Sequence, residues 1–259
     1  LAAAGAEARS QTLAGAAYGA ELPSGEPALA MGEAAAPAAL DFSTRARLAQ
    51  LAHQTRAEIV GIVRSVPFIA IIFFGLFNLL GSLVGDFDGT STYPLTRIMV
   101  RNIEGSFGIF LFIFLLVYAA QVVWREHRTR MHEIHSALPV PDWLPVASKL
   151  SALIVVQAMA LLAAMTVTVV YQLTQGYYAI EFGLYLRWFL LLQIPMTFVL
   201  GALALSTQVF ANNKLVGWGI MIVFFTLTEI AYVIGLEHNM SLYGEIPTAP
   251  YSDMNGYGH

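Results

Sequence analysis

Residues 66–85 read VPFIAIIFFGLFNLLGSLVG, a run of twenty residues without a charged side chain. An α-helix rises about 1.5 Å per residue, so about twenty residues cross the roughly 30 Å hydrocarbon core of a bilayer. Lipid offers no hydrogen bonds to the backbone, and a helix satisfies its backbone groups within the segment. This run therefore predicts a transmembrane helix and decides the class of the fold.

Four more apolar runs follow along the chain. They hold 20 to 23 residues each and lie at 105–124, 150–171, 188–210 and 215–236. Pro195 predicts a kink or a local opening in the fourth of these five runs, because proline removes a backbone donor. We therefore expect an all-α, polytopic membrane protein with five transmembrane helices in a domain at 66–236. Because five is odd, a sixth span beyond His259 would complete a six-helix unit.

The composition supports a membrane protein and excludes several function classes. Hydrophobic residues make up 57% of the chain and charged residues 12%, whereas soluble proteins are about a quarter charged. The net charge of −4 leaves no basic stripe for nucleic acid. The absence of cysteine excludes disulfides and thiolate metal sites within the chain. Neither of the two lysines, Lys149 and Lys214, belongs to a P-loop, so any ATP must be hydrolysed by another polypeptide or by another part of this one.

The residues before the first run divide into two segments. Residues 1–40 are rich in Ala, Gly, Glu and Pro without helical periodicity, which predicts a disordered linker. Residues 41–65 carry apolar side chains at three- and four-residue steps, and Asp41 or Ser43 can cap the start of a helix. This pattern predicts an amphipathic interfacial helix on the membrane surface, with Glu58 among its polar positions. A helix packed on a soluble partner is the alternative.

Positive charges are distributed unevenly between the two sides of the predicted membrane domain. Cytoplasmic loops carry an excess of Lys and Arg. Nine cations fall on one side: Arg45, Arg47, Arg56, Arg64, Arg125, Arg128, Arg130, Lys149 and Lys214. This bias predicts that the N-terminal side is cytoplasmic and that residues 237–259 form an external loop, which the chain truncates. We expect the chain to be an internal piece of a longer protein.

The segment between the second and third runs combines charge with a short apolar ridge. It reads WREHRTRMHEIHSALP over residues 124–139, and Met131, Ile134 and Leu138 supply the ridge. Its three histidines and two glutamates suggest a zinc site as one alternative, but a zincin helix needs two histidines four residues apart, and here the nearest such pair is three apart. A short helix with an apolar ridge is the kind of surface on which a soluble motor protein can press.

This segment resembles the corresponding part of permeases of type-2 ABC transporters, the exporter class. Those permeases carry a charged Glu/Arg stretch after their second span, then an ending in Leu and Pro, and then a lysine that opens the third span. The matching residues here are Arg125, Glu126, Arg128, Glu133, Leu138, Pro139 and Lys149. Met131 and His132 stand where the family typically has Gly-Thr.

A wider resemblance covers most of residues 42–259. Residues 123–143 and 251–259 are similar to large bacterial proteins in which two permease units precede an aminopeptidase N-like zinc peptidase domain. This resemblance implies that the chain is the second permease unit, in a bacterial inner membrane, with residues 1–40 as the linker from the first. The chain contains neither HExxH nor GxMEN, so no peptidase residue can be assigned to it.

The resemblance implies the transmembrane half of an ATP-driven exporter. An ABC nucleotide-binding subunit would bind the ATP and press on the loop, and a second permease unit would complete the pathway. The expected coupling residues are Arg125, Glu126, Arg128, Met131, Glu133, Ile134 and Leu138. We expect no catalytic residue, cofactor or metal in this chain. The alternative is a membrane anchor for an external zinc peptidase, without transport, while a haem enzyme is disfavoured because no histidine lies in a predicted span.

Two further features lie toward the predicted external side. Glu229 is the only charge within the last run, and a carboxylate in lipid is costly unless it is paired, protonated or in water. It is therefore an intramembrane polar candidate, with a hydrogen bond near the external end as the alternative. Aromatic side chains also collect at this level, which predicts an interfacial belt. They are Tyr171, Tyr177, Tyr178, Tyr185, Trp188, Tyr232 and Tyr243.

Overall fold

The computed structural model describes residues 43–87, 93–128, 141, 143–235 and 243, with backbone only at 126–128, 229 and 232. The chain divides into two compact units, Leu1–Phe42 and Ser43–His259, and the description below concerns the second. Every regular element among the described residues is a helix, which confirms the predicted all-α fold.

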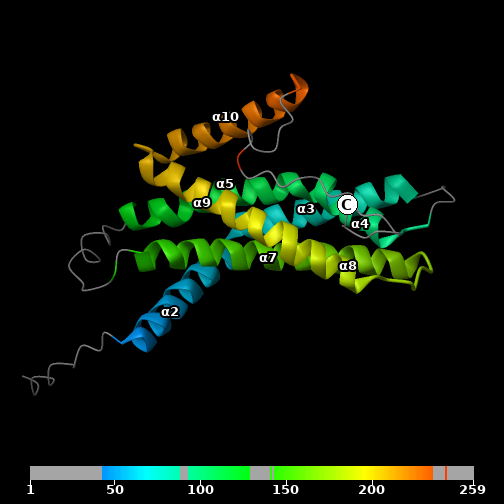
Figure 1. Cartoon of the computed structure of the whole chain (residues 1–259), viewed down its shortest axis with the longest axis horizontal. Helices are drawn as coiled ribbons and strands as arrows, with labels where there is room; N and C mark the ends of the chain where they lie inside the picture. The colour runs from blue at the N-terminus through cyan, green and yellow to red at the C-terminus, as the bar shows by residue number, and fades with distance from the viewer. Residues whose placement is uncertain (1–42, 88–92, 129–140, 142, 236–242, 244–259) are drawn as a thin grey trace, which may run out of the picture. The chain divides into compact units, whose positions relative to one another are not determined.

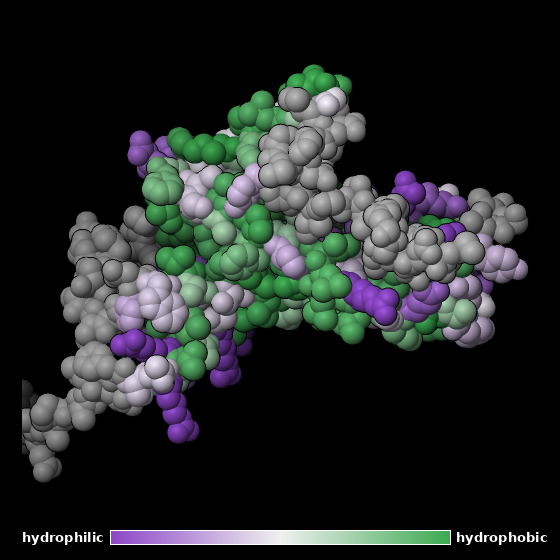
Figure 2. All heavy atoms as spheres, viewed as in Figure 1, coloured by the Kyte–Doolittle hydropathy of each residue, from purple (hydrophilic) through white to green (hydrophobic). Residues whose placement is uncertain are grey.

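Apolar helices of membrane-spanning length make up most of this unit. Four are long and apolar enough to cross a bilayer: α3 (Val66–Phe87), the continuous helix Thr96–Arg125, α7 (Trp143–Thr174) and the continuous helix Phe182–Phe210. A fifth helix, α10 (Lys214–Val233), has a shorter apolar part at Lys214–Thr228. The chain is therefore a multi-pass membrane protein, and the surface seen in Figure 2 is largely apolar along the helices, with hydrophilic residues toward their ends.

Two of the membrane-length helices contain a π-helical turn. The first consists of α4 (Thr96–Asn102), η1 (Ile103–Phe107) and α5 (Gly108–Arg128), and the second of α8 (Phe182–Arg187), η2 (Trp188–Gln193) and α9 (Ile194–Phe210). The irregularity predicted from Pro195 lies just before that residue, in η2, while Pro195 itself occupies the first turn of α9. Proline is tolerated in a first helical turn because its missing N–H would have no partner there.

A shorter helix, α2 (Thr44–Val63), precedes α3 (Figure 1). The Ser43 hydroxyl accepts a hydrogen bond from the backbone N–H of Ala46 at 3.2 Å, so the predicted cap at Ser43 is confirmed. Contrary to our expectation, Glu58 is buried rather than part of a solvated polar face. The reason is that α2 packs against α7, so the face that carries Glu58 and Ile62 turns into the bundle.

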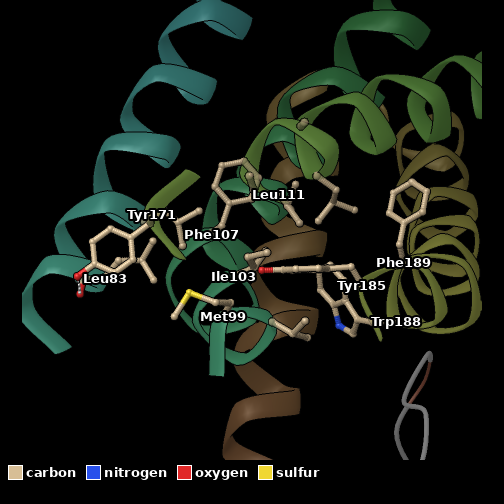
Figure 3. Close-up of a cluster of buried hydrophobic side chains, with 14 of the residues drawn as sticks. Leu83, Met99, Ile103, Phe107, Leu111, Tyr171, Tyr185, Trp188 and Phe189 are labelled. Atoms are coloured by element: carbon tan, nitrogen blue, oxygen red, sulfur yellow. Dashed lines mark hydrogen bonds between the residues drawn. The ribbon is translucent and has the colours of Figure 1, made fainter. Parts of the chain in front are cut away.

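The remaining helices pack around α5, which contacts α3, α7, α9 and α10 (Figure 1). A buried cluster at the end of the bundle that carries α4 includes Leu83, Ile103 and Phe107 (Figure 3). Tyr185 and Trp188 belong to the same cluster and are each 1% exposed. The belt prediction is therefore wrong for these two residues and for Tyr171, which is also buried.

Hydrogen bonds explain why these aromatic side chains lie inside the bundle. The Tyr171 hydroxyl donates to the carbonyl oxygen of Leu83 at 3.1 Å, and the Tyr185 hydroxyl donates to the side chain of Thr168 at 3.0 Å. A tyrosine whose hydroxyl has an internal partner can be buried at low cost, so it need not reach the interface.

Candidate functional site

The structure describes the predicted coupling residues unequally. Arg125 is described in full, Glu126 and Arg128 lie in the last turns of α5 with backbone only, and Met131, Glu133, Ile134 and Leu138 lie outside the described residues. The site can therefore be built from the end of α5 outward. We name this region the α5 root and define it as Trp124 and Arg125 with the side chains that contact them.

An ion pair joins the α5 root to α2. The Arg125 guanidinium Nη2 lies 2.5 Å from a carboxylate oxygen of Glu58. Glu58 is 7% exposed, whereas 40% of the Arg125 side chain is exposed. A buried carboxylate is costly without a cation, so the position of α2 and the position of Arg125 depend on one another.

The sequence of α2 is suited to this pair. Glu58, Gly61 and Ile62 are spaced at i, i+3 and i+4, which places them on one helical face. A Cβ at Gly61 would lie 2.9 Å from Nη1 of Arg125, so the absence of a side chain leaves room for the guanidinium. Sequence reasoning named Glu58 but did not pair it with Arg125, because 67 residues separate the two positions.

A hydrogen bond joins the α5 root to the end of α9. The indole N–H of Trp124 donates to the side-chain oxygen of Gln208 at 3.0 Å. Gln208 is 1% exposed, and no hydrogen-bond partner for its amide nitrogen is found among the described residues. Gln208 was not a sequence candidate, since a single glutamine in an apolar run carries no partner information.

The start of α10 packs on the same glutamine. A Cβ at Gly217 would lie 2.6 Å from the amide nitrogen of Gln208, so only glycine fits here without movement. One residue further, the indole N–H of Trp218 donates to the carbonyl oxygen of Leu116 in α5 at 3.0 Å. The α5 root therefore touches α2 through charge, α9 through a hydrogen bond and α10 through close packing.

The junction between α2 and α3 is held to α5 as well. The hydroxyl groups of Ser65 and Tyr118 form a hydrogen bond, and Tyr118 is fully buried. Ser65 also donates to the carbonyl oxygen of Ile62 at 2.7 Å. The residue that precedes the first span is therefore joined to α5 as well.

The other sequence hypotheses remain untested by the geometry. Within the residues that the structure describes, no three His, Asp or Glu side chains come close enough to hold a metal ion. The histidines of the zinc alternative at 127, 132 and 135 lie where side chains are not described. Glu229 lies in α10, and its side chain is also outside the described set.

Comparison with known families gives this arrangement its context. The model of the family described as ABC-2 family transporter protein matches residues 56–229, which is more than half of the chain and runs from α2 to α10. No match was found among curated proteins or among solved structures. Together with the membrane-length helices, this match establishes that the chain belongs to the ABC-2 transporter family, as a multi-pass permease component that pairs with an ABC ATPase subunit.

Proposed function

We propose that this permease component is part of an exporter and that residues 125–138 couple it to the ATPase subunit. When the subunit closes on ATP it presses on this loop, and the movement passes through the α5 root. The first, second and fifth spans, here α3, α5 and α10, then tilt so that a path opens outward. The N-terminal side is cytoplasmic in this proposal, and the membrane is the bacterial inner membrane.

The contacts of the α5 root are the observation that carries this proposal. Trp124 directly precedes the proposed coupling loop and Arg125 is its first residue, and they hold side chains from α9 and α2. Gln208 in turn meets α10 at Gly217. A push on the loop would act on all of these helices together, because packed interfaces shift as units rather than deform continuously.

Two further parts of the proposal rest on the family resemblance. A second permease unit would form the other side of the pathway, and an aminopeptidase N-like zinc peptidase domain would follow in the full-length protein. The competing function is an anchor for that peptidase without transport. An anchor needs no contact with an ATPase subunit, so the loop distinguishes the two functions.

The test is a double substitution in the loop, Met131→Asp with Ile134→Asp. Two carboxylates on the apolar ridge should remove the surface on which the ATPase subunit docks. We expect loss of co-purification with the ATPase subunit and loss of permease-stimulated ATP hydrolysis in nanodiscs. Neither measurement requires the transported substrate to be known.

Ala52→Asp with Ala57→Asp is the matched control, since both alanines are exposed on α2 and receive the same added charge. This control should leave both measurements unchanged. If the loop variant also retains ATPase binding and stimulation, the coupling proposal is wrong and the anchor function is favoured.

A further inference from the structure

A cleft opens on the surface of the membrane domain between α3 and η1. Its volume is about 610 Å³, within the range of roughly 300–1,000 Å³ that is typical of small-molecule sites. Twenty residues separate Gly105 in the cleft from Arg125, so the cleft lies roughly 30 Å along the helix from the α5 root. It is therefore a feature separate from the proposed coupling site.

The cleft forms because the two faces of α3 differ. Gly75 and Leu79 face the bundle, and a Cβ at Gly75 would lie 2.6 Å from a ring carbon of Phe107, so α3 and η1 approach closely there. The buried side of η1, with Ile103 and Phe107, is directed into the core (Figure 3). Phe77 lines the cleft on the outer side and is 67% exposed.

The π-helical turn brings polar groups into this cleft. Asn78 donates from its side-chain nitrogen to the carbonyl oxygen of Ser106 at 2.8 Å. Ser106 lies in η1, where backbone hydrogen bonds join residues five apart instead of four. The Ser82 hydroxyl donates to the side-chain oxygen of Asn102 at 2.9 Å. The side-chain oxygen of Asn78 and the hydroxyl of Ser106 have no partner among the described residues, so the cleft offers an amide acceptor and a hydroxyl that can donate or accept.

The cleft lies along the apolar length of α3 rather than at its end. The part of α3 that lines the cleft, from Phe74 to Ser82, lies about 8–20 Å from the end of the helix at Phe87. An exposed amide at this depth is costly in lipid unless a polar partner reaches it. None of the residues that line the cleft is charged, so the lining offers no counter-charge and favours an uncharged partner that dissolves in lipid.

We propose that this cleft binds the head of an uncharged amphiphile that enters from the surrounding lipid. A hydroxyl group of the ligand donates to the Asn78 oxygen, and an ester or amide oxygen accepts from the Ser106 hydroxyl. The aliphatic part lies against Phe74, Phe77 and Phe110. An amide and a hydroxyl side by side suit one small head group that carries both a donor and an acceptor. The site goes beyond the proposed transport function, and its occupancy requires neither ATP nor the ATPase subunit.

The test uses a diacylglycerol analogue with a photoactivatable diazirine in one acyl chain, because its head offers one hydroxyl and two esters without charge. The full chain is placed in phosphatidylcholine nanodiscs that contain this analogue and is irradiated, and the adducts are mapped by mass spectrometry. We expect adducts on the peptides that contain Phe77 and Phe110, and we expect excess unlabelled diacylglycerol to remove them.

Gly105→Leu fills the cleft, and a Cβ at Gly105 meets nothing within 4 Å, so this variant should fold. It should reduce the adducts about tenfold, which corresponds to roughly 1.4 kcal/mol of lost binding. Gly81→Leu, also in the cleft and also open, is a second filling variant. Gly85→Leu is the matched control, since it is open in the same way on α3 but lies outside the cleft, and it should leave the adducts unchanged.

Two results would overturn the proposal. Adducts that resist both the competitor and the filling variants would show general exposure to lipid rather than a site. The second result would come from Gly81→Cys. The chain has no cysteine of its own, so any disulfide must form at this position. A disulfide between two copies of this variant, together with an absence of adducts, would assign the cleft to a protein partner.

Discussion

Neutralising either partner of the ion pair in the α5 root should lower the free energy of unfolding. The exposure of the two side chains limits how large this loss can be. Removing one partner of a fully buried pair costs about 3–5 kcal/mol, whereas exposed pairs contribute about 0.2–1 kcal/mol. Glu58 is 7% exposed, and the Arg125 side chain is 40% exposed, so the pair lies between these limits. We expect Glu58 and Arg125 to be coupled by about 1–2 kcal/mol after this allowance for solvent screening.

The assay is a double-mutant cycle with Glu58→Gln, Arg125→Gln and the double variant, followed by thermal unfolding in detergent. For a chain of this size, 1–2 kcal/mol shifts Tm by about 2–8 °C. The double variant should lose less than the sum of the two single losses. A parallel cycle that combines Arg56→Gln with Arg125→Gln should be additive, because Arg56 is exposed on α2. Additivity within about 0.5 kcal/mol for Glu58 and Arg125 would refute the reasoning.

Two other predictions concern the packing of α10 and the orientation of the chain. Gly217→Ala should cost about 1–3 kcal/mol, because the new methyl group meets the buried amide of Gln208, while Gly219→Ala, with open space around it, should not. Equal Tm values for these two variants would show that Gln208 moves aside. A maleimide that does not cross membranes should label Tyr178→Cys on intact cells but should label Ala52→Cys only after permeabilisation. The opposite pattern would invert the proposed orientation.

The spans could be predicted from the sequence because lipid imposes a length and an apolar composition on each helix. The first run was expected to end at Gly85, and α3 continues to Phe87. The third run was expected to begin at Leu150, and the helix that contains it, α7, begins at Trp143. The predicted run contained no charged residue and therefore began after Lys149. The helix nevertheless includes Lys149 and buries it. The π-helical turns were not predicted, apart from the distortion near Pro195, since they depend on packing rather than on composition.

The candidate site was predicted only in part. Arg125 was identified from a local pattern, since a charged stretch after a span is visible along the chain. Its contact with Glu58 and the contact of Trp124 with Gln208 join residues 67 and 84 positions apart. Such pairs depend on which helices become neighbours, and the period of a single helix does not contain that information. Tyr185 shows the same limit, because its buried partner Thr168 is on another helix.

The two π-helical turns have a consequence for how the spans can move. Each such turn holds one residue more than an α-helical turn, so η1 and η2 each store a surplus residue within a membrane-length helix. The indole N–H of Trp188 in η2 donates to a carboxylate oxygen of Glu104 in η1 at 2.6 Å, which holds the two turns at one level. Releasing a surplus residue changes the register by one step, about 100° of rotation, without breaking the helix. The two turns are therefore the places in these spans where a change of register needs rearranged backbone hydrogen bonds rather than an unfolded helix.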